Sequence, residues 1–402
     1  MFARRMLVSV LAVTLLLIPS AGVGATETRD FGVNVLSTDG FVIAAGSVVV
    51  VGEVRNDTDF PVGNVKIRVR YLAGDGTKIL EQTVMALLDT LDPGEVSPFH
   101  ADAKIPQTAQ RFAAAVIDYD YPSMPANHYF TLSMPTNGNV DATTYGVVGT
   151  ARNDNTTQAD GIRVVATLYE ANGDVIGADE ALVDAASVAA GDVATFLVLV
   201  DHVGEVGRVT AVAESMSTPA LPTTLDLAPF ELPWGGPVVA TGKSTAGASV
   251  TIERYEYSLA SWVPTAGPVT ATADGSFSAT FKAGPTGSFR ASIEGGRSSL
   301  ALLIVDAAVT LKTSTKTARL GTKVTLSGTA APAYPGAKVL IQRKTGATWK
   351  TVLTAPVKSG KFSASWTPKA KGTWVLRAHL PAQSVQSIVF DGDSKTLTIT
   401  VK

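Results

Sequence analysis

The stretch VVGEVRND, residues 50–57, recurs 97 residues later as VVGTARND, residues 147–154. The same ungapped shift maps Gly94 onto Gly191, and further glycines, prolines and aromatic residues match in the same register. An unbroken register of this kind is hard to obtain by chance. The sequence therefore predicts two copies of one domain.

Both copies alternate apolar and polar residues in the way that a half-buried β-strand requires. The alternation is clearest in VKIRVRY, residues 65–71, and in IRVVATL, residues 162–168. The turn sequences GDG (74–76) and NG (172–173) follow these stretches and supply residues that tolerate positive φ. Short strands separated by turns, without a helical period, predict a β-sandwich for each copy.

A second, looser pair follows, in which GSFSATFKAGPTGSF (275–289) mirrors GKFSASWTPKAKGTW (360–374). The predicted fold class is all-β, with four tandem Ig-like β-sandwich domains in two types. The predicted divisions are a signal segment (1–25), domain A1 (26–125), domain A2 (126–222), a proline-rich spacer (223–237), domain B1 (238–306) and domain B2 (307–402). Because the joints are short, we expect a rod of closely spaced modules.

The N-terminus has the pattern of a cleaved secretory signal. Arg4 and Arg5 precede the apolar residues 7–18, and the small residues 23–25 predict cleavage before Thr26. The apolar run is too short to span a bilayer comfortably, so we expect a secreted protein without a transmembrane segment. The 402 residues contain no cysteine, which excludes disulfides, thiolate metal sites and a lipid-modified cysteine.

Two family resemblances follow from these residues. The G-x-V/A-x-N-D motif, followed by Leu168-Tyr169-Glu170 and Gly173, resembles the FxLYD-type repeat of bacterial envelope proteins, although A1 departs from it with residues 71–73, YLA. The last two domains resemble Ig-like modules of actinobacterial surface proteins. The segments that carry this second resemblance are VTLSGTA (324–330), WKTV (349–352), GKFSASW (360–366) and GTWVLRA (372–378). Both resemblances imply non-catalytic spacer, adhesion or binding modules.

Catalytic and metal-binding patterns are weak. None of His100, His128, His202 and His379 lies in a recognised catalytic motif, so the sequence predicts no enzyme. Calcium prefers several oxygen ligands, and the weak candidates for it are Asp57, Asp59, Asp391 and Asp393. The alternative is that these residues form β-turns, and the repeated RND sequence is expected to end a strand and order a turn in both copies.

Three tryptophans could stack on sugar rings: Trp234 in the proline-rich spacer, and Trp262 and Trp349 at expected edge or loop positions. They support an alternative function, a carbohydrate-binding protein that uses exposed aromatic residues of its C-terminal domains.

The charge distribution is the strongest non-structural signal. Residues 307–402 contain 15 basic and two acidic side chains, a net charge of +13, whereas residues 26–306 contain 16 basic and 33 acidic ones, a net charge of −17. The candidate electrostatic binding residues are Lys338, Arg343, Lys344, Lys350, Lys358, Lys361, Lys369 and Lys371. A basic domain attracts polyanions, although a solvated lysine surface that serves solubility is the alternative.

The favoured function is that of a secreted, non-enzymatic structural or adhesion protein of the cell surface, in which domain B2 is an electrostatic anchor. The expected partners are an anionic cell-wall or other envelope polymer, another surface protein, or the acidic domains of a second copy. Nucleic acid is not expected, because the chain has no reading motif.

Overall fold

The computed structural model of the protein describes residues 32–44, 46–105, 109–122, 126–384 and 388–402. The predicted signal segment lies outside these residues. The described chain is almost entirely β-structure, with one short 3-10 helix at Tyr257–Leu259. None of its helices is long and apolar enough to cross a membrane.

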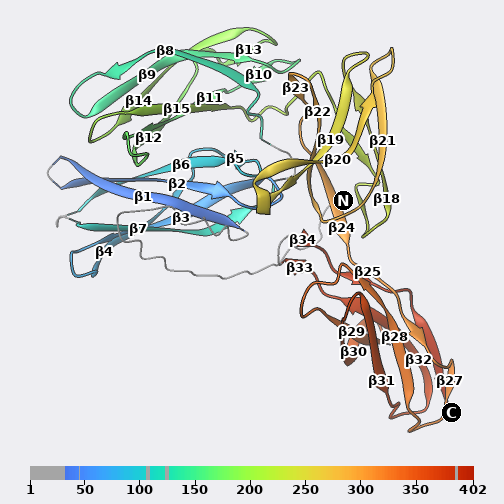
Figure 1. The fold of residues 1–402 in the computed structure, drawn as a ribbon. Helices are drawn as coiled ribbons and strands as arrows, with labels where there is room; N and C mark the ends of the chain where they lie inside the picture. The colour runs from blue at the N-terminus through green and yellow to red at the C-terminus, as the bar shows by residue number, and fades with distance from the viewer. Residues whose placement is uncertain (1–31, 45, 106–108, 123–125, 385–387) are drawn as a thin grey trace.

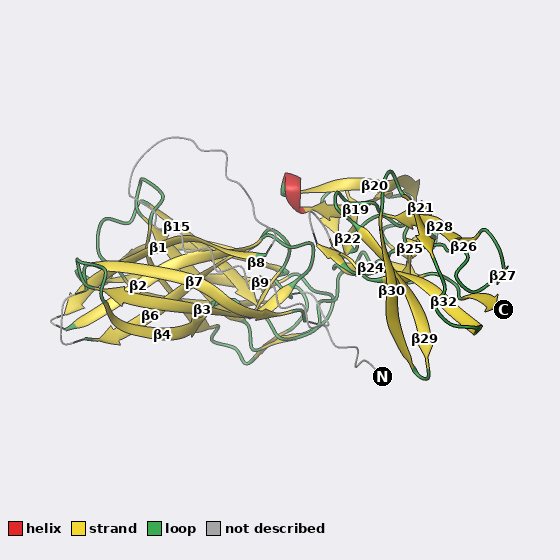
Figure 2. Cartoon of the chain, turned by 90° about the horizontal axis from the view of Figure 1, so that it is seen from below, coloured by secondary structure: helices red, strands yellow, loops and turns green. Residues whose placement is uncertain are grey.

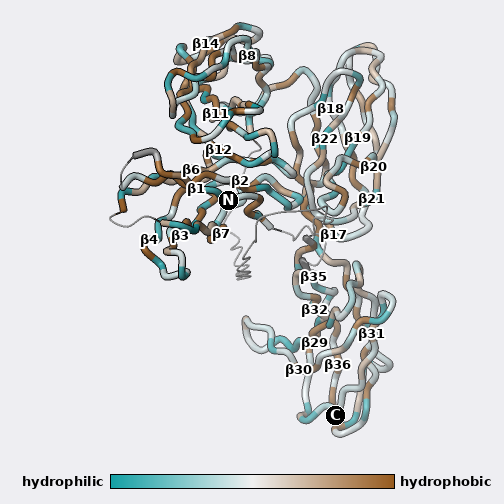
Figure 3. The backbone as a smooth tube through the Cα atoms, turned by 60° about the vertical axis from the view of Figure 1, so that its left-hand side comes forward, coloured by the Kyte–Doolittle hydropathy of each residue, from teal (hydrophilic) through white to brown (hydrophobic). Residues whose placement is uncertain are grey.

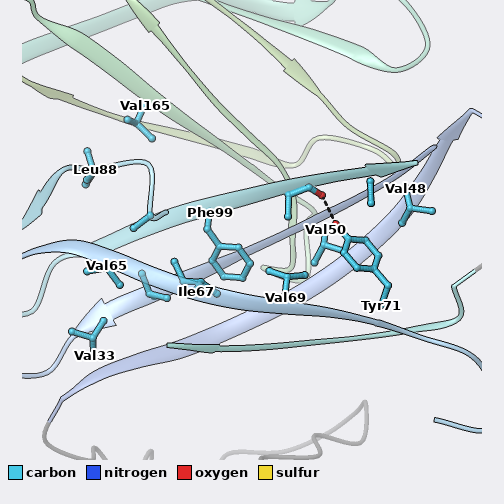
Figure 4. Packing of buried hydrophobic residues seen from close by; sticks show 14 of the residues in the cluster. Val33, Val48, Val50, Val65, Ile67, Val69, Tyr71, Leu88, Phe99 and Val165 are labelled. Carbon is cyan, nitrogen blue, oxygen red and sulfur yellow. Dashed lines mark hydrogen bonds between the residues drawn. The ribbon is translucent and has the colours of Figure 1, made fainter. Parts of the chain in front are cut away.

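Domain A1 is a sandwich of two antiparallel sheets. One sheet has the order β1 (Val33–Ala44), β2 (Ser47–Asn56), β6 (Val96–Lys104). In the other, β4 (Lys78–Met85), β5 (Thr90–Leu91) and β7 (Arg111–Asp120) pair with β3 (Val62–Leu72). Valines of β2 and β3 pack between the sheets with Phe99 and Tyr71, whose hydroxyl donates to the Ala101 carbonyl at 3.0 Å (Figure 4).

Domain A2 repeats this plan. One sheet has the order β14 (Val193–Asp201), β9 (Thr144–Asn153), β8 (Phe130–Asn139), and the other has the order β12 (Val175–Leu182), β11 (Arg163–Tyr169), β15 (Arg208–Glu214). The short strands β10 (Ala159–Asp160) and β13 (Ser187–Val188) form a separate pair. The core-facing residues of β11 include those that the alternation predicts, Ile162 just before the strand and Val164, Ala166 and Leu168 within it.

Domains B1 and B2 each pair a smaller sheet with a larger one. In B1 the smaller sheet is β16 (Asp226–Ala228), β18 (Pro237–Lys243), β21 (Ser276–Lys282), and the larger is β17 (Glu231–Pro233), β24 (Ala301–Asp306), β22 (Gly287–Ile293), β19 (Ser249–Glu256), β20 (Ser261–Thr270), with β23 (Gly296–Arg297) beside β22. In B2 the smaller sheet pairs β28 (Val324–Ala331) with β25 (Ala308–Val309), β26 (Lys312–Thr313) and β31 (Lys361–Trp366). The larger is β27 (Thr317–Ala318), β36 (Leu397–Val401), β32 (Gly372–Leu380), β29 (Lys338–Thr345), β30 (Thr348–Pro356), with β35 (Gly392–Asp393) beside β32, and β33 (Gln383–Ser384) pairs separately with β34 (Ile388–Val389). The fold is therefore all-β and built from β-sandwiches, as the sequence predicts.

Residues 223–237 differ from the expected spacer, because strands β16 and β17 of domain B1 lie within them. The prolines fall at places that a sheet tolerates: Pro229 follows β16 and Pro233 ends the edge strand β17. The proline content therefore marks short edge strands here and not a free linker.

Domains A1 and A2 are not strung end to end as a rod. They lie flank to flank, so that their four sheets form a stack with β8–β9–β14 at one surface and β3–β4–β7 at the other (Figure 1). Val49 and Val51 on the outer face of β2 pack against Tyr169 and Val175 of A2. The Tyr169 hydroxyl donates to a Glu53 carboxylate oxygen at 2.5 Å. Local joints can be short in such a stack because each domain folds back on its neighbour.

Domain B1 contacts the end of A1, so that both B domains lie at one end of the A1–A2 stack (Figure 2), and B2 extends away from B1 (Figure 1). The Asp59 carbonyl of A1 accepts hydrogen bonds from the Ser288 backbone N–H at 3.0 Å and from its hydroxyl at 2.8 Å. Between B1 and B2, Phe390 forms a parallel bridge with Asp306. The rod-like extension thus lies at the C-terminal end of the molecule.

One packing feature recurs in all four domains. A glycine on a core strand lies under the ring of a phenylalanine on the paired strand, and a Cβ built on the glycine would come within 2.6–2.7 Å of the ring. The pairs are Gly52 and Phe99, Gly149 and Phe196, Gly242 and Phe277, and Gly328 and Phe362. The A and B types therefore share a packing solution that the two sequence repeats, taken separately, do not reveal.

Candidate anion-binding face of the last domain

The smaller sheet of B2 carries a groove of about 620 Å³ on its outer face. The register of the sheet assembles it: Ser327 on the central strand β28 pairs with Lys312 on one side and with Ser363 on the other. One step along, Thr329 pairs with Lys361. Residues paired across antiparallel strands project to the same face, so this face combines hydroxyl groups in its middle with lysines at both edges.

The groove offers hydrogen-bond donors and positive charge. Its lining residues are Thr310, Lys312, Ser327, Gly328, Thr329, Pro356, Lys358, Lys361, Phe362 and Ser363, and none of them carries a carboxylate. Lys312, Lys358 and Lys361 are all exposed. The Thr310 and Thr329 hydroxyls lie 2.8 Å apart and leave further capacity to bind a ligand oxygen. The chemistry of this face suits an anion with several oxygens, such as a phosphodiester.

The two acidic side chains of B2 lie elsewhere. Asp393 accepts a hydrogen bond from Arg377 and lies 2.9 Å from His379 Nδ1, next to the larger sheet. Asp391 lies 3.9 Å from the same His379 nitrogen. The positive field over the groove is therefore not neutralised by these carboxylates.

The eight basic residues predicted from the sequence fall into separate places. Lys358 and Lys361 line the groove, whereas Lys338, Lys344 and Lys350 lie on the hairpin β29–β30 and Lys369 and Lys371 lie in the loop before β32. Arg343 packs inward, with its guanidinium carbon 3.7 Å from the centre of the Trp374 ring. The structure thus brings two of the eight together, with Lys312 as a third.

Lys312, Thr310, Ser327 and Thr329 were not singled out as site residues from the sequence. The pairing of VTLSGTA with GKFSASW sets Thr329 opposite Lys361 and Ser327 opposite Ser363. Lys312 joins them because β26 pairs with Ser327, and Thr310 because its hydroxyl contacts that of Thr329. Sequence alone shows that Lys312 is one of many dispersed lysines. It does not show which lysines share a sheet face.

Two of the three candidate tryptophans are stacked on arginines. In B1, Arg290 lies over the Trp262 ring at 4.3 Å and donates to Glu253 at 2.8 Å. In B2, Arg377 lies over the Trp349 ring at 4.4 Å and donates to Gln342 at 2.8 Å. One face of each indole is therefore covered by a guanidinium group, as in a cation–π contact that stabilises the sheet.

The third tryptophan, Trp234, lies half-buried at the joint of the two B domains. It packs against the hydrophobic cores of both B1 and B2, and its backbone N–H donates to the Asp306 carbonyl at 2.8 Å. This position assigns it a role in joining the domains.

The acidic candidates for calcium are engaged in other contacts or are buried. The Asp57 carboxylate pairs with Arg55 at 2.7 Å, and Asp393 pairs with Arg377. Asp59 is fully buried, and burial raises its pKa to about 7 despite the nearby Arg254. Among the residues that the structure describes, no three acidic or histidine side chains are grouped as metal ligands. The donor sets around these aspartates do not fit a calcium site.

The repeated RND sequence orders a turn in both copies, which confirms the structural interpretation. The Asn56 side chain donates to the carbonyls of Phe60 and Leu91, at 2.6 and 3.0 Å. Asn153 donates in the same way to Thr157 and Val188, at 2.8 and 2.9 Å. Both asparagines are fully buried.

The histidines are held in separate environments. His100 and His379 pair with Asp102 and Asp393, both at 2.9 Å. His202 is buried beside Tyr145. His128 lies between A1 and A2, with its ring nitrogens 3.0 Å from Glu95 and 3.3 Å from Glu214. Burial alone would lower the pKa of His128, but the two carboxylates raise it to about 10, so this imidazolium forms part of a domain contact.

No protein-family profile matches the sequence, and no curated protein matches it. Solved structures that align with the chain include an Escherichia coli alpha-2-macroglobulin activated by porcine elastase, at 10% identity over 92% of this chain and 44% of that chain, with a TM-score of 0.21. The chain thus spans less than half the length of that macroglobulin.

Two tandem-repeat proteins also align. A tetra-tandem repeat from the extending region of a large adhesion protein is 16% identical over 92% of this chain and 98% of its own, with a TM-score of 0.21. A chimeric titin Z1Z2–Z1Z2 tandem is 16% identical over 45% of this chain and 100% of its own, with a TM-score of 0.19. At these TM-scores no shared arrangement of domains is established, and nothing about function follows from the three likenesses.

Proposed function

We propose that this protein is an exported, non-enzymatic component of the cell envelope, whose last domain binds an anionic surface polymer. The supporting observation is the B2 groove, where three exposed lysines flank a row of hydroxyl groups with no carboxylate in the lining. Domains A1, A2 and B1 then form the body that B2 holds at the surface. The resemblance to FxLYD-type repeats and bacterial Ig-like modules is consistent with this role and stays a prediction.

Electrostatics makes B2 the attachment end of the molecule. Its net charge of +13 contrasts with −17 for residues 26–306. An anionic polymer is therefore attracted to B2 and repelled by the remainder over about one Debye length, roughly 8 Å at physiological ionic strength. This asymmetry favours an orientation in which the acidic domains point away from the polymer.

The tryptophans support a neutral sugar as ligand less strongly than the groove supports a polyanion. A sugar-binding platform needs an aromatic face open to the ring of the sugar, and arginines leave only the opposite face of Trp262 and of Trp349 for such stacking. Trp234 lies half-buried between the two B cores. The lysine groove has no comparable obstruction.

The test uses the full mature chain with three groove lysines neutralised together, Lys312→Gln, Lys358→Gln and Lys361→Gln. A matched control carries Lys338→Gln, Lys344→Gln and Lys350→Gln, which removes the same charge from the hairpin β29–β30. Binding to poly(glycerol phosphate), polyglutamate and neutral dextran is measured across a salt series. We expect the groove variant to bind poly(glycerol phosphate) at least about tenfold more weakly than the control, equivalent to about 1.4 kcal/mol.

Equal weakening in the two variants would show that diffuse charge and not the groove carries the binding. Binding of dextran that is insensitive to salt would favour the carbohydrate alternative. Export is tested separately, by sequencing the N-terminus of the protein recovered outside the cell, where cleavage before Thr26 is expected.

A further inference from the structure

The outer face of the sheet β8–β9–β14 of A2, here called the open face, is apolar and exposed. Val140, Val148, Val193, Leu197 and Leu199 are each between 41 and 63% exposed on it or at its edge. Leu197 pairs directly with Val148, and Leu199 pairs with a glycine beside which Val140 packs. These residues lie along the outermost sheet of the A1–A2 stack, where β14 is a hydrophobic strand (Figures 1 and 3).

The equivalent face of A1 is covered. The shift of 97 residues maps Val148 onto Val51, which is only 1% exposed because A2 packs on it. Leu197 and Leu199 map onto His100 and Asp102, a polar pair. The covered face of A1 therefore has polar residues at positions where the open face of A2 has leucines. The fold of the chain itself gives no reason for those leucines.

We propose that the open face is a dimer interface, occupied by the same face of a second copy of this chain. The other outer face of A2 is buried against A1, through residues such as Val165 and Tyr169. The outer face of β3 in A1 carries Lys66, Arg68 and Arg70. Among the outer sheet faces of the A domains that the structure describes, only the open face is both apolar and exposed. Its apolar partner on a second copy is therefore the same face, and two identical faces meet in a two-fold, isologous contact.

The charges at the ends of the open face suit this two-fold arrangement. The outward row of β14 runs from Val193 through Leu197 to Asp201, so Leu197 is at its centre. Arg152, 54% exposed and paired with Asp154 at 2.7 Å, lies opposite Val193 at the end away from Asp201. When a two-fold axis passes through Leu197, the β14 strands of the two copies run antiparallel. Asp201 of each copy then lies near Arg152 of the other. Stacked sheets align in this way at about 10 Å separation.

The first experiment uses the absence of cysteine from the chain. Leu197→Cys places one thiol from each copy at the dyad, and Val239→Cys, on an exposed strand of B1, is the control. Under mild oxidation we expect a disulfide-linked dimer of Leu197→Cys at micromolar concentration and none of Val239→Cys. Equal cross-linking rates for the two variants would overturn the proposal.

Sedimentation equilibrium of the unmodified chain gives the second readout. We expect a monomer–dimer equilibrium that Leu197→Lys weakens at least about tenfold, since like charges meet at the dyad, and that Val239→Lys leaves unchanged. Asp201→Arg is expected to weaken the dimer and Arg152→Asp in the same chain to restore it. A monomer at all concentrations, or a dimer indifferent to Leu197→Lys and Leu199→Lys, would refute the open-face dimer. Neither outcome bears on polymer binding by B2.

Discussion

At the scale of single residues, one glycine in each of the four domains lets a phenylalanine ring lie across the paired strand. In B1 a Cβ on Gly242 would come within 2.6 Å of Phe277 Cζ and still closer to the Thr224 carbonyl. Neither neighbour can move freely, because one is backbone and the other is a buried core ring. The glycine is therefore required for close approach and not for an unusual φ angle.

This requirement predicts that Gly242→Ala destabilises B1 by about 1–3 kcal/mol or more, as overpacking of a core does. The matched control is Gly284→Ala in the same domain, where a Cβ meets no atom within 4 Å. Hydrogen exchange measured by mass spectrometry across β18 and β21 reports the change domain by domain. Unaltered exchange in Gly242→Ala would mean that the sheet relaxes at no cost.

At the scale of secondary-structure elements, identical sequence patterns have different surroundings. β2 and β9 contain the same repeated phrase, yet β2 is buried on both faces, whereas β9 is open on one. Alternation predicted the inward residues of β3 and β11 correctly, because that information is local. It could not predict that Val165 and Tyr169, on the opposite face of β11, are covered by A1.

The candidate site likewise has a part that the sequence predicts and a part that depends on the folded structure. A basic last domain could be predicted from composition, and so could Lys358 and Lys361 as candidates. The groove depends on cross-strand register, which joins Lys312 and Lys361 to the hydroxyl row across strands separated by tens of residues. The side chains of Arg343 and the tryptophans also depend on tertiary neighbours, such as Trp374 and Arg377, that a local pattern does not specify.

The contrast between repeats predicts a substitution that separates A1 from A2. Val165 corresponds to Arg68 in A1, where an arginine is accommodated on the outer face of the same strand. Val165→Arg is therefore compatible with the sandwich but overfills the buried contact with A1, where its cross-strand partner is Glu180, at a cost of about 1–3 kcal/mol to the interface. Small-angle scattering extrapolated to infinite dilution should show a larger radius of gyration. Val239→Arg in B1 should leave that radius unchanged, and an unchanged radius in Val165→Arg would contradict the prediction.

At the scale of the whole molecule, buried ionisable groups gather where A1 meets its neighbours. Asp59 of A1 lies fully buried against B1 near Arg254 and Glu256. His128 contacts Glu95 of A1 and Glu214 of A2, and burial raises the pKa of the neighbouring Asp92. Arg163 of A2 pairs with Glu214 and lies 3.1 Å from Asp89 of A1. The relative placement of three domains thus depends on protonation as well as on apolar contact.

From these groups we predict that the body formed by A1, A2 and B1 is more stable at pH 5 than at pH 8. The pKa of Asp59 is raised from 3.8 to about 7, so the folded state loses stability as pH rises through that interval, by up to about 4 kcal/mol. The pKa of His128 is raised from 6.5 to about 10, so its contribution is complete below 6.5 and is lost as pH rises toward 10. The two effects have the same sign.

Melting temperatures measured from pH 4.5 to 9 should therefore fall as pH rises. The melting temperature of Asp59→Asn, whose side chain cannot ionise, should fall less steeply than that of Asp174→Asn, a substitution at an exposed turn. Parallel profiles for the two variants would remove Asp59 from this account, whereas a profile that rises from pH 5 to pH 8 would contradict the whole assignment.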